Sequence, residues 1–326
     1  MTTITLDATA LEKLVAAAVA APSIHNSQPW RFRLQQDTST LEVRADRGRA
    51  VPVTDPKGRA LHLSVGAAVL NLRVAARHLG WAPEVRLLPD PSEPDLLAAV
   101  ELDVPAAAPV PGTERLYEAI WHRHSLRMPF TGEPVPPAVL AELVDAARSE
   151  EVALLLPDRA ETARLLRLTA EAEGRNTNDP AQRAESRSWI RTGQEPPYGI
   201  PAAALGPQDS AGRLPMRDFT ALRPAEHRPP ARFEAEPRIG VLTTDGDGPA
   251  DWLRAGLALE HVLLAATVHE VRASLLDQAM EWPQLRREAR DPHGRPGYVQ
   301  LLLRLGYGPE GAPTPRLAAD AVIEQT

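Results

Sequence analysis

Two short polar stretches of the sequence carry the side chains best suited to binding a ligand. The first, residues 21–32, reads Ala-Pro-Ser-Ile-His-Asn-Ser-Gln-Pro-Trp-Arg-Phe. Pro22 and Pro29 restrict its backbone. The short donors and acceptors between them are Ser23, His25, Asn26, Ser27 and Gln28. This loop has no Lys, no Arg and no Gly-rich run between its prolines, so it suits a flat heteroaromatic ring better than a phosphate.

The second stretch, Trp121–Phe130, places Arg123, Ser125 and Arg127 on alternate residues. Two guanidinium groups around a hydroxyl form a good clamp for a phosphate. We interpret the two stretches as the two ends of one flavin mononucleotide (FMN) site. The competing interpretations are a bracing role for the loop amides and hydroxyls, and a solvated face or a pairing with Glu133 for the arginines.

Composition narrows the class of protein. The chain has 326 residues, a net charge of −7 and a pI near 5.8, which argues against nucleic acid or an anionic membrane as the main partner. Without cysteine it has no disulfides, thiolate nucleophiles or thiolate metal ligands. The apolar run Leu14–Ala21 follows Asp7 and Glu12 rather than a basic region, so it does not fit a signal peptide. We expect a cytoplasmic protein with a small-molecule substrate and no membrane span.

Hydrophobic periodicity predicts alternating helices and strands. The expected helices cover residues 5–20, 61–79, 114–124, 136–149, 160–174 and 251–270. The expected strands cover residues 30–34, 41–45, 84–88, 97–102, 152–156, 238–244 and 298–305, with a short segment at 271–276. Each half of the chain repeats the same succession faintly and ends its repeat on a long Ala- and Leu-rich helix. This pattern indicates an α+β fold of two similar halves, each with a mainly antiparallel sheet flanked by helices.

A loop-rich insert of about residues 173–236 interrupts the second half. A segment of this length inside a domain is typical of a lid, the alternative being a disordered linker. Its aromatic residues Trp189, Tyr198 and Phe219 could stack on a ligand or anchor the lid. Residues 244–248 (Thr-Asp-Gly-Asp-Gly) lack the third glycine of a dinucleotide fingerprint. We expect a plain strand-to-helix turn there. His122 and His124 lack a nearby third metal ligand.

The run Pro22-Ser-x-His-Asn-Ser-Gln-Pro-Trp30 resembles the flavin-binding loop of the nitroreductase superfamily, and residues 123–127 resemble its phosphate-binding motif. In ordinary members the arginine motif comes first, and each flavin of the homodimer lies across the subunit interface. Here the order is reversed. No arginine precedes Arg31, and nothing like the ring loop follows Arg127. The arrangement is similar to the Acg-type branch, in which a fused pseudo-dimer would hold one complete site and one dead one.

The resemblance implies a first half at 1–112, which carries the ring loop, and a second half at 113–326, which carries the phosphate clamp. It implies a monomeric pseudo-dimer or a homodimer. The implied cofactor-binding residues are Pro22, Ser23, His25, Asn26 and Gln28 at the ring end, Arg123, Ser125, Arg127 and Arg316 at the phosphate, and Ser274 and Leu275 at the N5 edge of the ring. Arg304 and Arg295 compete with Arg316 for its place.

The implied function is that of an FMN-dependent oxidoreductase of nitroreductase type. Hydride would pass through flavin N5, NAD(P)H would be the transient reductant, and a small organic molecule would be the acceptor. No side-chain catalyst is implied. The alternative is a catalytically silent FMN-binding protein for storage or sequestration, with the flavin covered by the insert. A flavin-free interaction module is a third reading.

Overall fold

The first half of the chain forms one four-stranded antiparallel sheet. The computed structural model describes residues 6–191, 193, 196–220, 229–290, 294 and 296–324. The strands of this sheet are β1 (Trp30–Gln35), β2 (Thr40–Ala45), β3 (Glu84–Leu87) and β4 (Leu96–Glu101), in the order β1-β2-β4-β3. Helix α1 (Ala8–Val19) packs against α2 (Arg59–His78), which joins the second strand to the third.

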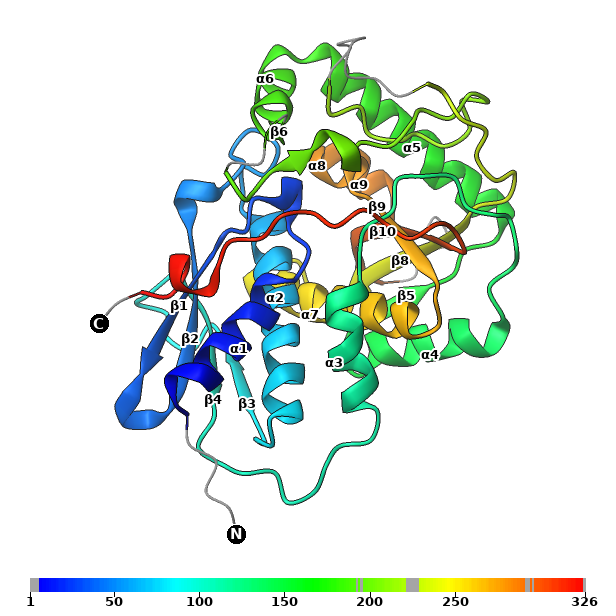
Figure 1. Ribbon diagram of the computed structural model, residues 1–326. Coiled ribbons are helices and arrows are strands. Elements are labelled where there is room, and N and C mark those ends of the chain that lie inside the picture. Colours follow the sequence, from blue (N-terminus) through cyan, green and yellow to red (C-terminus); the bar gives the residue numbers. More distant parts are fainter. Residues whose placement is uncertain are drawn as a thin grey trace.

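The second half repeats this topology. Its strands are β5 (Ala153–Leu155), β8 (Arg238–Thr244), β9 (Arg272–Leu276) and β10 (Tyr298–Gly306), in the order β5-β8-β10-β9. Helix α7 (Pro249–Val268) again joins the second strand to the third. The two sheets lie on either side of the central helices α2 and α7 (Figure 1). The expected α+β fold with internal duplication is therefore the observed one.

The crossing of α2 and α7 is two-fold symmetric at the level of single residues. A Cβ atom added to Gly66 would lie 2.2 Å from the carbonyl oxygen of Leu253, and one added to Gly256 would lie 2.1 Å from that of Leu63. Each glycine thus opposes the residue three positions before the other glycine, as in an isologous dimer interface. Only a residue without a side chain allows the two backbones to approach this closely.

The remaining helices are α3 (Thr113–His122), α4 (Pro137–Arg148), α5 (Arg159–Asn178), α6 (Pro180–Ser188), α8 (Gln278–Glu281) and α9 (Pro283–Glu288). The insert is therefore more regular at its start than the sequence indicated. Asp158 caps α5, which runs on to Asn178, and Asp179 caps α6 through two backbone N–H groups. Pro180 occupies the first turn of α6, where its missing N–H costs nothing. Past α6 the described part of the insert contains the short strands β6 (Ile190–Arg191) and β7 (Ile200–Pro201).

The C-terminal segment returns to the first sheet. Phe32 of β1 donates its N–H to the carbonyl of Val322 and accepts a bond from the N–H of Glu324. The red segment therefore lies beside blue β1 in Figure 1, although the two are far apart in sequence. Residues 244–248 form a strand-to-helix turn between β8 and α7, as expected. None of the helices among the described residues has the length and apolarity needed to cross a bilayer.

Candidate functional site

The loop between α1 and β1 is held in a strained conformation. His25, Asn26 and Gln28 have φ angles of 51°, 53° and 52°. Non-glycine residues rarely adopt positive φ, and such residues gather at ligand-binding sites. The Ser23 hydroxyl accepts a bond of 3.0 Å from the Gln28 N–H, and the Ser64 hydroxyl of α2 accepts one of 3.1 Å from the Ile24 N–H. These bonds fix the shape of the loop.

A pocket opens beside this loop, between the two halves of the chain. The ring loop, α2, β9 and the insert all contribute to its walls, and Arg127 projects into it. Its lining includes Pro22, Ser23, His25, Ser64, Arg127, Met216, Phe219, Ser274 and Leu275. The structure thus brings together several predicted ring-end residues with Ser274 and Leu275, which lie some 250 positions away in the printed numbering.

His25 is buried and neutral in this pocket. Burial, followed by the positive charge of Arg217, lowers the pKa of His25 to about 3. The Arg217 guanidinium lies 3.3 Å from Nε2. Because arginine only donates, Nε2 must accept, and the ring proton must sit on Nδ1. That Nδ1–H is a buried donor without a partner among the described residues, and the buried Ser274 hydroxyl is likewise unpartnered.

Asn26 and Gln28 bind the protein rather than line the pocket. The Asn26 amide donates to the carbonyls of Gly199 (2.8 Å) and Pro315 (3.0 Å), and its oxygen accepts from Arg316 at 2.9 Å. The Gln28 amide donates to the Pro197 carbonyl and accepts from the Leu317 N–H. The expected contact of Asn26 with the ring is therefore replaced by a contact that ties the insert and the C-terminal segment to the loop.

Arg123 and Arg316 form a basic pair next to the loop. Both guanidiniums donate to the carbonyl of Ala20, at 3.2 and 3.3 Å. Nε of Arg123 lies 3.3 Å from a carboxylate oxygen of the fully buried Glu260. Burial raises the pKa of Glu260 to about 7, and burial together with the charge of Arg123 lowers that of Arg316 to about 9. One carboxylate thus faces two cations, so the cluster carries a net positive charge.

The remaining members of the predicted clamp lie elsewhere. Arg127 donates to the carbonyl of Ala204 at 3.2 Å, and its guanidinium stands 4.9 Å from the centre of the Phe219 ring. It therefore belongs to the pocket rather than to the Arg123–Arg316 pair. Ser125 pairs with Ala273 at the free edge of β9. The phosphate clamp drawn from alternate residues is thus corrected to a pair built from Arg123 and the C-terminal Arg316.

The competitors of Arg316 are accounted for differently. Arg304 is fully buried and binds Glu234 and the Met128 carbonyl, with its guanidinium 3.7 Å from the centre of the Phe130 ring. It is a structural ion pair. Arg295 falls outside the described residues. His122 and His124 hold no metal site, because the described part of the chain contains no group of three potential ligands.

The described part of the insert lies over the pocket. Met216, Arg217 and Phe219 line it, and Phe219 meets the His25 ring edge-on with centroids 5.6 Å apart. Arg217 also binds Asp277 at 3.3 Å and Glu281. Trp189 and Tyr198 pack against one another, 6.0 Å apart. Phe219 is therefore the aromatic residue of the insert that reaches the pocket, and the other two anchor the segment.

Sequence reasoning missed Glu260 and Arg217. Glu260 is an acid within the apolar run Leu257–Leu264 of α7, which is a readable signal because charged residues are seldom fully buried without a partner. Arg217 lies in the insert among other arginines, and nothing in its sequence surroundings separates it from them.

The symmetry-related position in the second half lacks the loop. The connection from α1 to β1 spans residues 20–29, whereas that from α4 to β5 spans only residues 149–152. In the shorter connection the buried carboxylate of Glu150 binds Arg73 of α2 and His261 of α7. These bonds lower the pKa of Glu150 to about 2 against the opposing effect of burial. An internal ion-pair cluster thus stands where a second ring loop would be needed.

Comparison with known proteins agrees with this architecture. No family model matches the sequence. The "Putative NAD(P)H nitroreductase Rv3131" of Mycobacterium tuberculosis is 33% identical over 98% of this chain and 92% of that protein. The "Putative NAD(P)H nitroreductase acg" of the same species is 31% identical over 96% of this chain and 95% of that protein.

Among solved structures, an FMN-bound nitroreductase from Desulfitobacterium hafniense aligns with a TM-score of 0.40 at 13% identity, over 65% of this chain and 98% of that one. The two mycobacterial relatives, by contrast, match almost from end to end. The chain is therefore a member of the nitroreductase-like family, in the branch that contains the acg protein.

Proposed function

We propose that the chain binds one FMN, with its ring in the pocket and its phosphate at Arg123 and Arg316. The observation that carries the proposal is the set of buried polar atoms without partners among the described residues: His25 Nδ1, Ser274 Oγ, Arg123 Nε and Arg316 Nε. Leaving such groups unpaired is costly. A planar ring with nitrogen and carbonyl acceptors would satisfy the first two, and a phosphate dianion would satisfy the arginines.

Each of the surrounding residues then has a definable task. His25 donates from Nδ1, and its proton stays there because Arg217 occupies Nε2. Arg127 supplies positive charge beside the ring, while Phe219 and Met216 exclude water from that face. Bound FMN would supply reversible two-electron chemistry through its N5 atom. The protein contributes position, hydrogen bonds and access, so no side chain needs to act as nucleophile or general acid.

The finer proposal is an oxidoreductase that takes hydride from NAD(P)H and passes it to a small organic acceptor. The naming of the relatives as NAD(P)H nitroreductases supports this reading. The test is an absorption spectrum of the purified protein, with the cofactor released by heat, identified and counted. One FMN per chain supports the proposal. Two per chain contradict the assignment of a single site, and none after FMN is added leaves a flavin-free interaction module.

A second candidate, a storage or sequestering protein, is favoured by the bonds that close the insert over the site. Asn26 and Gln28 tie residues 197–199 to the loop, and Phe219 covers His25. Anaerobic mixing of the yellow protein with NADPH separates the two candidates. Rapid loss of the visible flavin band excludes a storage protein closed to reductant, whereas an unchanged spectrum excludes the reductase.

A further inference from the structure

A second cavity of about 520 Å³ adjoins the pocket. The two share Ile24, Arg59, Ala60 and Asp277 as wall residues, so they meet at the N-terminal end of α2. The outer walls of the second cavity come from α8, α9 and the start of β10. Apolar surface is supplied there by Met280, Tyr298 and Val299 among others. The cavity therefore offers an apolar chamber that opens toward the proposed ring position.

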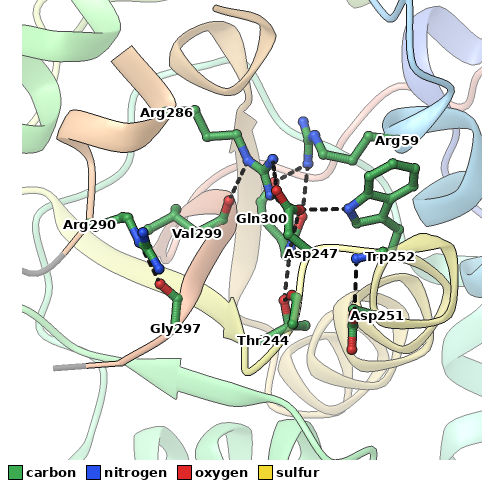
Figure 2. A network of polar contacts seen from close by, with 12 residues as sticks. Arg59, Thr244, Asp247, Asp251, Trp252, Arg286, Arg290, Gly297, Val299 and Gln300 are labelled. Atoms are coloured by element: carbon green, nitrogen blue, oxygen red, sulfur yellow. Dashed lines mark hydrogen bonds and ion pairs between the residues drawn. The ribbon is translucent and has the colours of Figure 1, made fainter. Parts of the chain in front are cut away.

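One wall of this cavity is a rigid polar network (Figure 2). Arg286 makes two bonds to the Asp247 carboxylate, at 2.8 and 2.6 Å, and one to the Gln300 side-chain oxygen at 2.9 Å. The Trp252 indole donates to the same carboxylate at 2.7 Å, and the Gln300 amide donates to the Thr244 hydroxyl at 2.7 Å. The network is internally satisfied, so Arg286 and Asp247 neutralise one another.

Arg59 is different, because it has charge and donors to spare. Its side chain enters the network from α2 and donates through Nη1 to the Gln300 carbonyl at 2.6 Å (Figure 2). It is only 7% exposed, and no described carboxylate lies within ion-pair distance of it. Burial and the charge of Arg286 lower the pKa of Arg59 to about 10, which leaves it a cation at neutral pH. An unpaired buried guanidinium beside a cavity requires an explanation.

The other charges around the cavity add to the same sign. Asp277 and Glu281 are bound by Arg217 of the insert, and Asp55 accepts the backbone N–H of Leu61. By contrast, Lys57, Arg287 and Arg290 line the cavity without a carboxylate partner among the described residues. The N-terminus of α2 adds positive partial charge. The acids are thus committed elsewhere, while four cations remain available to a ligand.

We infer that this cavity binds a small organic anion, with a carboxylate or phosphate held by Arg59 and an apolar body against Met280 and Tyr298. Its relevance to turnover rests on the proposed FMN function, because Arg59 would then hold the anion next to the ring. The binding site itself rests on Arg59 and the cavity alone. In the reductase reading, the occupant defines the acceptor class as an anionic, largely apolar molecule.

The test uses the protein as purified and three probes of one shape: benzoate, phenylphosphate and neutral benzamide. Calorimetry measures their affinities independently of the flavin, and FMN content is determined on the same samples. Benzoate or phenylphosphate should bind and benzamide should not; whichever anion binds more tightly identifies the head group. In Arg59→Met that affinity should fall by about tenfold or more. The matched control Arg47→Met removes an exposed arginine, paired with Asp95, that lines neither cavity.

Lys57→Met provides a second variant, since Lys57 is exposed at the cavity and does not line the FMN pocket. It should weaken the anions by a few-fold and leave FMN content unchanged. Equal binding of benzamide and benzoate, or equal binding by wild type and Arg59→Met, would overturn the inference. Absence of FMN in a protein that still binds benzoate through Arg59 would contradict the proposed function and leave the anion site standing.

Discussion

Replacing Glu260 with Gln tests the electrostatics of the proposed phosphate site. The carboxyl is fully buried beside Arg123, and burial raises its pKa from 4.5 to about 7. The folded chain therefore keeps this proton between pH 4.5 and 7, where the unfolded chain has already lost it. In that window the carboxyl makes the native state less stable as pH rises. Each pH unit corresponds to about 1.4 kcal/mol, so the total is roughly 3 kcal/mol.

Glu260→Gln removes this dependence, because Gln mimics the protonated side chain at every pH. Urea unfolding of the FMN-free protein, followed from pH 4.5 to 8, should give a difference in unfolding free energy between variant and wild type. We expect that difference to rise by roughly 3 kcal/mol up to about pH 7 and then to level off. Other titrating groups cancel in the difference. The exposed substitution Glu12→Gln serves as control and should give a flat line.

The same variant should alter cofactor affinity. A phosphate at Arg123 and Arg316 would approach the Glu260 carboxylate, so binding above pH 7 requires proton uptake. Wild-type affinity for FMN should then fall by up to about tenfold per pH unit above 7, while Glu260→Gln should show a weaker dependence and tighter binding. A flavin fluorescence titration at pH 6 and 8.5 measures this. Identical pH profiles in both proteins, or a flat stability difference, would refute the reasoning.

Three further outcomes are expected. Arg316→Gln and Arg123→Gln should each lower FMN occupancy, with a loss of about 1.5–3 kcal/mol in binding free energy, measured as flavin per chain after dialysis. Asn26→Ala removes the bonds that tie Gly199 to the ring loop, so FMN should dissociate faster and NADPH should reduce it faster, as stopped-flow absorbance would report. Gly66→Ala should destabilise the fold by about 1–3 kcal/mol or more in urea unfolding, because its Cβ would overlap backbone of α7.

Local sequence patterns predicted most of the fold. Long apolar helices such as α7 and β-branched or apolar strands such as β10 were found because their periodicity is strong. Helix α6 was missed because it is short and almost entirely polar, and its stability depends on the Asp179 cap and on contacts with the rest of the chain. The expected boundary of the two halves near residue 112 remains a proposal, although α3 follows it directly.

The site was harder to predict than the fold, because side-chain roles depend on partners far along the chain. The motif at residues 22–30 correctly directed attention to the ring loop. It could not reveal that Asn26 would bond to Gly199 rather than point into the pocket. Similarly, pairing Arg123 with Glu260 and Arg316 joins three segments that no local pattern connects. Such contacts follow from the topology, which single-sequence periodicity does not contain.

The symmetric crossing at Gly66 and Gly256 has a consequence for how this chain can change. In a homodimer every substitution appears at both copies of a site, so a change that helps one face must be tolerated at the other. Covalent fusion removes that constraint: Glu260 occurs on α7, while Leu70 takes its place on α2 when the helices are matched through their glycines. Once joined, one side was free to lose its loop and acquire a stabilising ion pair, and the other to specialise.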